Sequence, residues 1–376
     1  MFFSIVIPLY NKEKSIGNTL KSVLNQTFTD FEVIVVNDGS TDNSANVVTE
    51  FAKQDRRIRL VNKPNGGVCS ARNRGIQEAK HEYIALLDGD DIWDNTFLDT
   101  QTKLITDFPL ANLWGVNYAF VKGGKTQVCQ QGMGNGFCGY VENYFGTSHN
   151  DLFCSSSVVI RKTIFEKTGL FDERIRYSED LDMWYRIILH SKVVFYDNVL
   201  AFYNQNAENR VAYDLQIHYD LTKYLPYYTF KYEKDIQANK VFANYFCTRT
   251  VNTLLRENYW FGTEKDQADA DTIIPHIRFD AIHPKYRWIF LTPRWFGWLV
   301  YQTVTMKKQL STSISKSAKS LTKLNGGGYS QASDLEIINI LQPDKVAVIR
   351  LQIIQYDICS RIVFCTILQT YYFTNK

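Results

Sequence analysis

Three carboxylates stand within four positions of the segment YIALLDGDDIWDN, which covers residues 83–95. Asp88, Asp90 and Asp91 come directly after an apolar stretch with the composition of a buried strand. Like charges this close repel one another, and burying them costs free energy unless a cation neutralises them. Residues i and i+2 of an extended segment point to the same side, so we expect Asp88 and Asp90 to work as a pair. Asp91 is expected to cap or brace the next turn.

A hard divalent cation suits this pair of aspartates. Mg²⁺ and Mn²⁺ take carboxylate oxygens in proteins and usually keep water and substrate phosphates in the same shell. The cluster therefore predicts a site for Mn²⁺ or Mg²⁺ that binds together with a nucleoside diphosphate. The alternative is an acidic turn on the surface, because an isolated D-x-D pattern also occurs by chance.

The cluster belongs to a region that alternates between strands and helices. Helices are expected from about Ser15 and from about Asp42, and residues 67–80 are expected to be a loop that enters a third helix. Four apolar strands are expected at 3–10, 31–38, 58–63 and 83–89. This order predicts an α/β fold with a mostly parallel sheet flanked by helices and right-handed crossovers.

Polar side chains follow each of these four strands. Tyr10 and Asn11 follow the first, Asp38 follows the second, and a segment that contains Arg72 follows the third. Ligands of open parallel sheets bind beyond the carboxyl ends of the strands, so we expect these residues to join the acidic cluster in one site. Asp38 is suited to accept hydrogen bonds from a base or ribose, and Arg72 is suited to hold phosphates. This alignment favours the metal site over the surface turn.

The next hundred residues are less regular. Segments 113–122 and 125–131 flank a Gly-Gly pair and read as a hairpin. A strand is expected at 155–162, a short helix before Gly169, a helix at 179–190 and a closing strand at 192–197. We therefore expect the α/β domain to cover 1–210.

Helical, aromatic-rich sequence follows, and we assign it to a second region at 211–306. Its segment KYRWIFLTPRWFGWLVYQTV, residues 285–304, carries four charged or proline positions and lacks the roughly 18 apolar residues of a spanning helix. The Trp and Arg mixture suits an amphipathic segment at a membrane surface, and a buried helix pair is the alternative. A basic, Ser-rich linker and an unassigned tail complete the chain at 307–376.

Composition limits the partners and the compartment. The net charge of +3 and the lack of an arginine-rich arm argue against nucleic acid. Seven scattered cysteines without a C-x-x-C pattern indicate reduced thiols. The start MFFSIVIPLYN has no basic stretch before its apolar run and reads as a first strand, not as a signal peptide. We expect a cytoplasmic protein that can lie on the inner face of the membrane through 285–304.

An ordered set of motifs carries a resemblance over roughly residues 3–205. The runs SIVIPLYNKEKSIGNTLKSVLNQTFTDFEVIVVNDGSTDNS, NGGVCSARNRGI and YIALLDGDD resemble family 2 glycosyltransferases with the GT-A fold. The resemblance implies a Rossmann-like mixed sheet and an inverting, metal-dependent transferase with a nucleotide-sugar donor, for which a UDP-sugar is favoured. It assigns Asp38 to the nucleotide base, Asp88 to the ribose or metal, and Asp90 to the metal. It also assigns four residues to the nucleotide pocket: Pro8, Tyr10, Asn11 and Arg72.

The same resemblance identifies an acidic pair in GLFDERIRYSEDLDMW. Asp180 matches the catalytic base, with Glu179 beside it. A base must take the proton of the acceptor hydroxyl, and a helix N-terminus keeps a carboxylate ionised for that task. Capping of the helix is the alternative for both acids. Trp184 can stack on an acceptor sugar, with packing in the core as its alternative.

Two departures from the family pattern bear on the mechanism. Many relatives carry Arg-x-His after the last strand of the domain, whereas residues 201–210 read AFYNQNAENR. Water is therefore expected to complete the metal shell. A Q-x-x-R-W signature of processive enzymes is also absent, which favours transfer of a single sugar.

The expected function is transfer to a glycan or lipid-linked acceptor in cell-surface polysaccharide assembly. A non-catalytic homologue that binds nucleotide sugar is one alternative. A sugar nucleotidyltransferase is another, but it needs a Gly-rich, basic loop after the first strand, where this chain has YNKEKSIGN. A NAD-dependent dehydrogenase would need G-x-G-x-x-G at the same place, and this chain lacks that pattern there.

Overall fold

The computed structural model describes residues 1–146, 152–175, 179–208, 231–254 and 268. The chain divides into two compact units, Met1–Tyr224 and Leu225–Lys376. The membrane-surface segment 285–304 and the linker and tail at 307–376 lie outside the described residues. The expected boundaries at 210 and 306 stay predictions.

The first unit is built on one sheet of ten strands. They are β1 Phe3–Leu9, β2 Phe31–Asp38, β3 Ile58–Lys63, β4 Tyr83–Leu86, β5 Ile92–Trp93, β6 Ala111–Lys122, β7 Lys125–Val128, β8 Cys138–Tyr140, β9 Val158–Arg161 and β10 Lys192–Asn204. The order is β3-β2-β1-β4-β9-β6-β10-β5, with β7 on β6 and β8 on β10. Strands β1 to β4 pair in parallel, as does β6 with β10, while β9 is antiparallel to both of its neighbours. The predicted α/β fold is confirmed.

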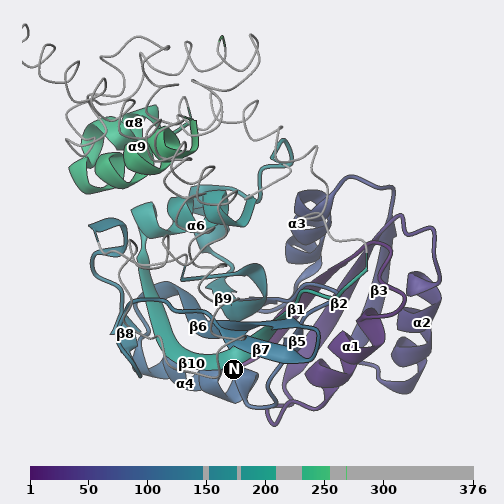
Figure 1. The fold of residues 1–376 in the computed structure, drawn as a ribbon. Coiled ribbons are helices and arrows are strands. Elements are labelled where there is room, and N and C mark those ends of the chain that lie inside the picture. Colours follow the sequence, from purple (N-terminus) through teal and green to yellow (C-terminus); the bar gives the residue numbers. More distant parts are fainter. Residues whose placement is uncertain (147–151, 176–178, 209–230, 255–267, 269–376) are drawn as a thin grey trace, which may run out of the picture. The chain divides into compact units, whose positions relative to one another are not determined.

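Helices cover both faces of the first strands. They are α1 Ile16–Leu24, α2 Ser44–Gln54, α3 Val68–Glu78, α4 Phe97–Asp107, α5 Ile164–Thr168 and α6 Glu179–His190. Two short 3₁₀ helices, η1 Tyr144–Gly146 and η2 Ser155–Ser157, complete the unit. Figure 1 shows α3 on the opposite side of β1 to β3 from α1 and α2. This explains why β1 and β2 are mostly apolar on both faces, since helices cover both sides of these strands.

The late strands differ from the sequence-based expectation. The segment expected as a strand at 155–162 begins with the turn of η2, and only Val158–Arg161 pairs with the sheet. Strand β10 runs to Asn204, well beyond the expected end at 197. The two-residue strand β5 pairs with β10 through Ala201–Trp93 and Phe202–Ile92. Through this pairing, the segment that follows the acidic cluster is held against β10, the last strand of the sheet in sequence order.

The described part of the second unit contains helices α8 Glu233–Ala238 and α9 Lys240–Leu254. Their contact is aromatic: the rings of Tyr232, Phe242 and Phe246 lie 5.4 to 5.5 Å apart between centroids. These helices agree with the helical, aromatic pattern of the sequence. Within the described ranges, no helix is both long and apolar enough to cross a bilayer.

Candidate active site

The acidic turn lies directly on the end of β1. A side-chain carbon added at Gly89 would lie only 3.0 Å from the Pro8 carbonyl oxygen, so glycine favours this close approach. The amide of Asp91 donates to the carbonyl of Asp88 at 3.1 Å and closes the turn. The predicted convergence of the first and fourth strand ends is therefore present in the structure.

Asn11 joins the ends of β1 and β2. Its backbone is left-handed, with φ of 51°, a conformation that asparagine tolerates better than most residues. Its amide donates to Ser40 Oγ at 3.1 Å, and its side-chain oxygen accepts from the Thr41 amide at 2.8 Å. The neighbouring Tyr10 is 40% exposed, so part of its ring is accessible at this edge of the sheet.

Asp38 organises the loop between β3 and α3. Its buried carboxylate accepts from Lys63 Nζ at 2.5 Å and from the amides of Gly66 and Gly67 at 2.9 and 2.7 Å. Gly67 has φ of 89°, which favours glycine at the entry to α3. Asp38 therefore shapes the wall of the site, and its expected contact with a nucleotide base stays a prediction.

Arg72 connects two groups of acids. Its guanidinium donates to Asp88 Oδ1 and to Glu179 Oε1, both at 2.8 Å, and its side chain is only 3% exposed. Burial alone would lower the pKa of Arg72, but the two carboxylates outweigh it and raise the pKa. The sequence suggested a phosphate ligand, whereas this geometry makes Arg72 a brace between the acidic turn and the start of α6.

Asp90 and Asp91 have different surroundings from Asp88. Asp90 Oδ2 lies 2.7 Å from Lys12 Nζ. Burial raises the pKa of Asp90, the Lys12 ammonium opposes this shift, and the charge of Asp88 adds to it.

Asp91 is buried and accepts hydrogen bonds from Ser156 Oγ at 2.5 Å and from the Asn204 amide at 3.0 Å. Burial raises the pKa of Asp91 well above its usual value, as do the charges of Asp90 and Asp88. The prediction that Asp91 braces the turn is confirmed.

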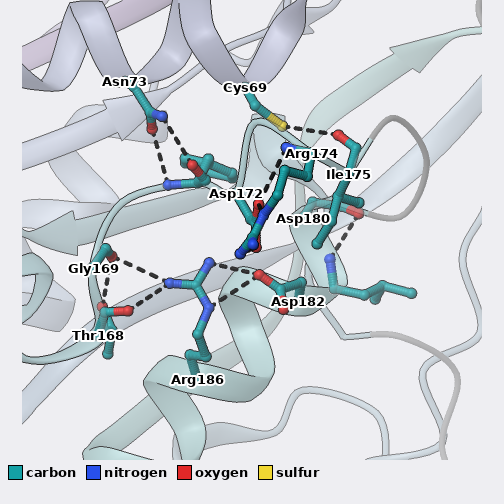
Figure 2. Close-up of polar contacts among 12 residues, drawn as sticks. Cys69, Asn73, Thr168, Gly169, Asp172, Arg174, Ile175, Asp180, Asp182 and Arg186 are labelled. Carbon is teal, nitrogen blue, oxygen red and sulfur yellow. Dashed lines mark hydrogen bonds and ion pairs between the residues drawn. The ribbon is translucent and has the colours of Figure 1, made fainter. Parts of the chain in front are cut away.

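Helix α3 also fixes the loop that leads to Asp180 (Figure 2). The Asn73 amide donates to the Phe171 carbonyl at 2.9 Å, and its oxygen accepts from the Phe171 amide at 2.9 Å. The Cys69 thiol donates to the Ile175 carbonyl at 3.4 Å. The helix that carries Arg72 therefore holds the loop before α6 at two residues, Phe171 and Ile175, through three hydrogen bonds.

Arg186 of α6 links the first turn of this helix to the end of α5. Asp182 is buried and lies 2.6 Å from the guanidinium of Arg186, one helical turn later. Arg186 also donates to the carbonyls of Thr168 and Gly169 at 2.7 and 3.3 Å, as Figure 2 shows. Asp180 follows Glu179 in the first turn of this fixed helix. Its carboxylate stands where the helix dipole favours a negative charge.

Trp184 belongs to the core. Its side chain is fully buried, with its ring 6.4 Å from that of Phe171 in an edge-to-face arrangement. A sugar cannot stack on a ring without an exposed face. The assignment of Trp184 to the acceptor site is therefore corrected, and the core alternative accounts for its position.

The two working aspartates fit a divalent cation by their chemistry. Both offer hard carboxylate oxygens, and each keeps a second oxygen outside its ion pair with Arg72 or Lys12. In the described ranges, no group of three or more His, Cys, Asp or Glu residues could hold a metal alone. Two aspartates are sufficient for a cation that also takes diphosphate and water oxygens.

Two site residues were not singled out from the sequence. Lys12, which pairs with Asp90, belongs to the YNKEK run. Glu208, the last described residue of the segment after β10, accepts from the amides of Lys14 and Ser15 and lies beside Lys12. A cavity of about 310 Å³ is lined by Glu208, Asp90 and the start of α1 at Lys14 and Ser15. The charge of Lys12 next to the acidic turn was the available signal, whereas nothing local pointed to Glu208.

Comparisons with known proteins point to glycosyltransferases. The family model "Glycosyl transferase family 2" matches residues 4–169. The chain is 34% identical over 182 residues to the uncharacterized glycosyltransferase EpsJ of Bacillus subtilis, a match over 47% of this chain and 53% of EpsJ. It is 29% identical over 231 residues to the glycosyltransferase GlyG of Streptococcus pneumoniae, over 56% of this chain and 74% of GlyG.

Solved structures show the same fold. The crystal structure of Staphylococcus aureus TarS 1–349 in complex with UDP-GlcNAc matches 75% of this chain and 83% of that chain with a TM-score of 0.63. The sequences are 18% identical, so this likeness concerns the fold. With the motif set and the fold in agreement, residues 4–169 resemble the family 2 glycosyltransferases.

Proposed function

We propose that this chain transfers a single sugar, with inversion, from a nucleoside-diphosphate donor to a hydroxyl of a glycan or lipid-linked acceptor. The reaction requires Mn²⁺ or Mg²⁺ and is of the hexosyltransferase type. One observation carries the proposal: Arg72 bridges Asp88 and Glu179 at 2.8 Å on each side. This bridge connects the aspartates suited to the donor with the residue next to the candidate base, Asp180.

The residues at the two ends of the Arg72 bridge have different roles in the proposed reaction. Asp180 takes the proton of the acceptor hydroxyl, whose oxygen attacks the anomeric carbon as the bond to the diphosphate breaks. A divalent cation held by Asp88 and Asp90 would neutralise the charge that develops on the diphosphate. Arg72 stays with its two carboxylates, because it is buried between them, and fixes the distance between donor and base.

Two observations support a nucleotide-sugar donor. TarS was crystallised with UDP-GlcNAc, which supports a UDP-sugar as the donor class. Tyr10 and Asn11 lie at the joined ends of β1 and β2, where the nucleotide is expected. We assign the acceptor to cell-surface polysaccharide assembly, which suits a peripheral protein on the inner face of the membrane.

The test is the variant Asp180→Asn. Loss of a general base lowers turnover by about 10²- to 10⁴-fold, while the donor still binds because Asp88 and Asp90 are unchanged. Turnover is followed with a panel of UDP-, GDP- and dTDP-sugars, and donor affinity is followed by calorimetry.

The matched control is Asp172→Asn on the loop before α6. Asn at that position keeps an acceptor for the Arg174 amide, which Asp172 binds at 3.1 Å, so turnover should stay near the wild-type value. Wild-type turnover in Asp180→Asn would remove Asp180 as the base. Donor binding without any turnover in the wild type would favour a non-catalytic homologue that binds nucleotide sugar.

A further inference from the structure

The Asp90 carboxylate already has a positively charged partner within the chain, the ammonium group of Lys12. Lys12 Nζ lies 2.7 Å from Asp90 Oδ2, with the two side chains only 13% and 15% exposed. The same ammonium donates to the Glu208 carbonyl at 2.6 Å. This partly buried ion pair is better shielded from solvent than a surface pair, so its loss has a larger effect on Asp90.

The segment after β10 helps to hold this lysine in place. Glu208 Oε1 accepts from the amides of Lys14 and Ser15 at 2.9 and 3.2 Å, at the start of α1. At the other end of the segment, the Asn204 amide donates to Asp91 at 3.0 Å. Lys12 is thus enclosed by residues attached both to α1 and to the acidic turn.

Two cations cannot share one carboxylate without repulsion. A divalent ion on Asp90 must displace Lys12 or bind against its positive charge. The diphosphate of a donor relieves this conflict, because its oxygens offer Lys12 another anionic partner at the same edge of the sheet. Metal and donor then bind with positive coupling, since each improves the site for the other.

We propose that Lys12 is a positioning residue that competes with the divalent cation for Asp90, so that the metal binds tightly only together with the donor diphosphate. The inference rests on the proposed function, since it assumes that Asp90 is a metal ligand. This competition explains the position of Lys12 beside the acidic turn, because Lys12 keeps the metal ion from occupying the site before the donor binds.

The test measures Mn²⁺ binding by calorimetry and by water-proton relaxation, without nucleotide, in the full chain. Lys12→Gln removes the competing charge and should tighten Mn²⁺ binding by about tenfold, a usual size for such coupling. Lys12→Arg keeps the charge and should leave Mn²⁺ binding weak. Lys12→Ala serves as a second neutral variant, and thermal melting checks that each variant is folded.

The matched control is Lys21→Gln, which removes an exposed positive charge on α1 outside the lining of the cavity at Asp90. Its Mn²⁺ affinity should stay close to that of the wild type. Unchanged or weaker Mn²⁺ binding in both Lys12→Gln and Lys12→Ala would overturn the proposal, as would equal tightening in Lys21→Gln. If Lys12→Gln tightens Mn²⁺ binding but no donor is turned over by the wild type, the competition stands and the proposed transferase activity fails.

Discussion

At the scale of single residues, the three neighbouring aspartates have three different partners. Asp88 pairs with Arg72, Asp90 pairs with Lys12, and Asp91 accepts hydrogen bonds from Ser156 and Asn204. The sequence was enough to predict that Asp91 stands apart, because alternate residues face opposite ways. It was not enough to predict the partners, since each comes from a segment at least 16 positions away.

Removal of the metal tests the role of Asp88 and Asp90. In EDTA, the affinity for UDP should fall about tenfold, because the diphosphate then meets two carboxylates without a divalent cation between them. Calorimetry with and without Mn²⁺ measures the difference. Asp90→Asn should bind UDP equally in EDTA and in Mn²⁺. Equal affinity of the wild type under both conditions would contradict the metal site.

Replacement of Arg72 tests the bridge to α6. Arg72→Lys keeps one charge but loses the planar fork that reaches both Asp88 and Glu179, so the base moves relative to the donor. A misplacement of about 1 Å costs about 10²-fold in rate, and turnover should fall by about that factor with donor KM changed much less. Arg74→Lys is the control, because Arg74 lies on the same helix, is 51% exposed and pairs with Glu78. A fall in donor affinity alone would instead indicate a phosphate ligand.

At the scale of elements, α3 is the part on which the site depends most. It begins at the loop held by Asp38, carries Arg72, and holds the loop before α6 through Asn73 and Cys69. Its residue Gly75 faces β1, where an added side-chain carbon would lie 2.2 Å from Val6 Cγ1. A small shift of α3 would therefore change both the donor side and the base side of the site.

Gly75 in α3 and Gly17 in α1 offer a matched pair of variants that test the close packing of α3 on β1. Gly75→Ala should lower the free energy of unfolding by about 1–3 kcal/mol, because α3 must move away from Val6. Gly17→Ala on α1 should raise it by about 0.5–1 kcal/mol, since the new carbon lies at ordinary contact distances of 3.8 and 3.9 Å from Phe51 and Val47. Urea unfolding measures both. An unchanged or raised free energy of unfolding in Gly75→Ala would contradict the close packing of α3 on β1.

Sequence patterns predicted the early elements better than the late ones. Strands β1 to β4 and helices α1 to α3 follow local rules, with continuous apolar strands and a helical period of apolar residues. Strand β5 has only two residues and is formed by its pairing with Ala201 and Phe202, which no local pattern reveals. The end of β10 is fixed by contacts with distant strands for the same reason. Glu208 was missed as a consequence, because its position depends on where β10 ends.

At the scale of the whole molecule, the first unit contains every described residue of the proposed donor and base sites. The site residues lie between Pro8 and Glu208 in the sequence, in the unit that is built on the ten-stranded sheet. The family match at 4–169 lies within the same unit. The second unit has its own aromatic contacts in α8 and α9. This division suggests separate tasks, with donor chemistry in Met1–Tyr224 and acceptor recognition in the aromatic region that follows.

A chain shortened to Met1–Tyr224 tests this division. It should fold, because its buried core is formed by its own strands and helices, and it should bind UDP with Mn²⁺ within a few-fold of the full chain. Slow hydrolysis of the donor should persist, since Asp88, Asp90 and Asp180 are all retained, while transfer to the acceptor should be lost with the second unit. Calorimetry measures UDP binding, and product analysis separates hydrolysis from transfer. Full transfer activity in the shortened chain would show that the acceptor site also lies within the first unit.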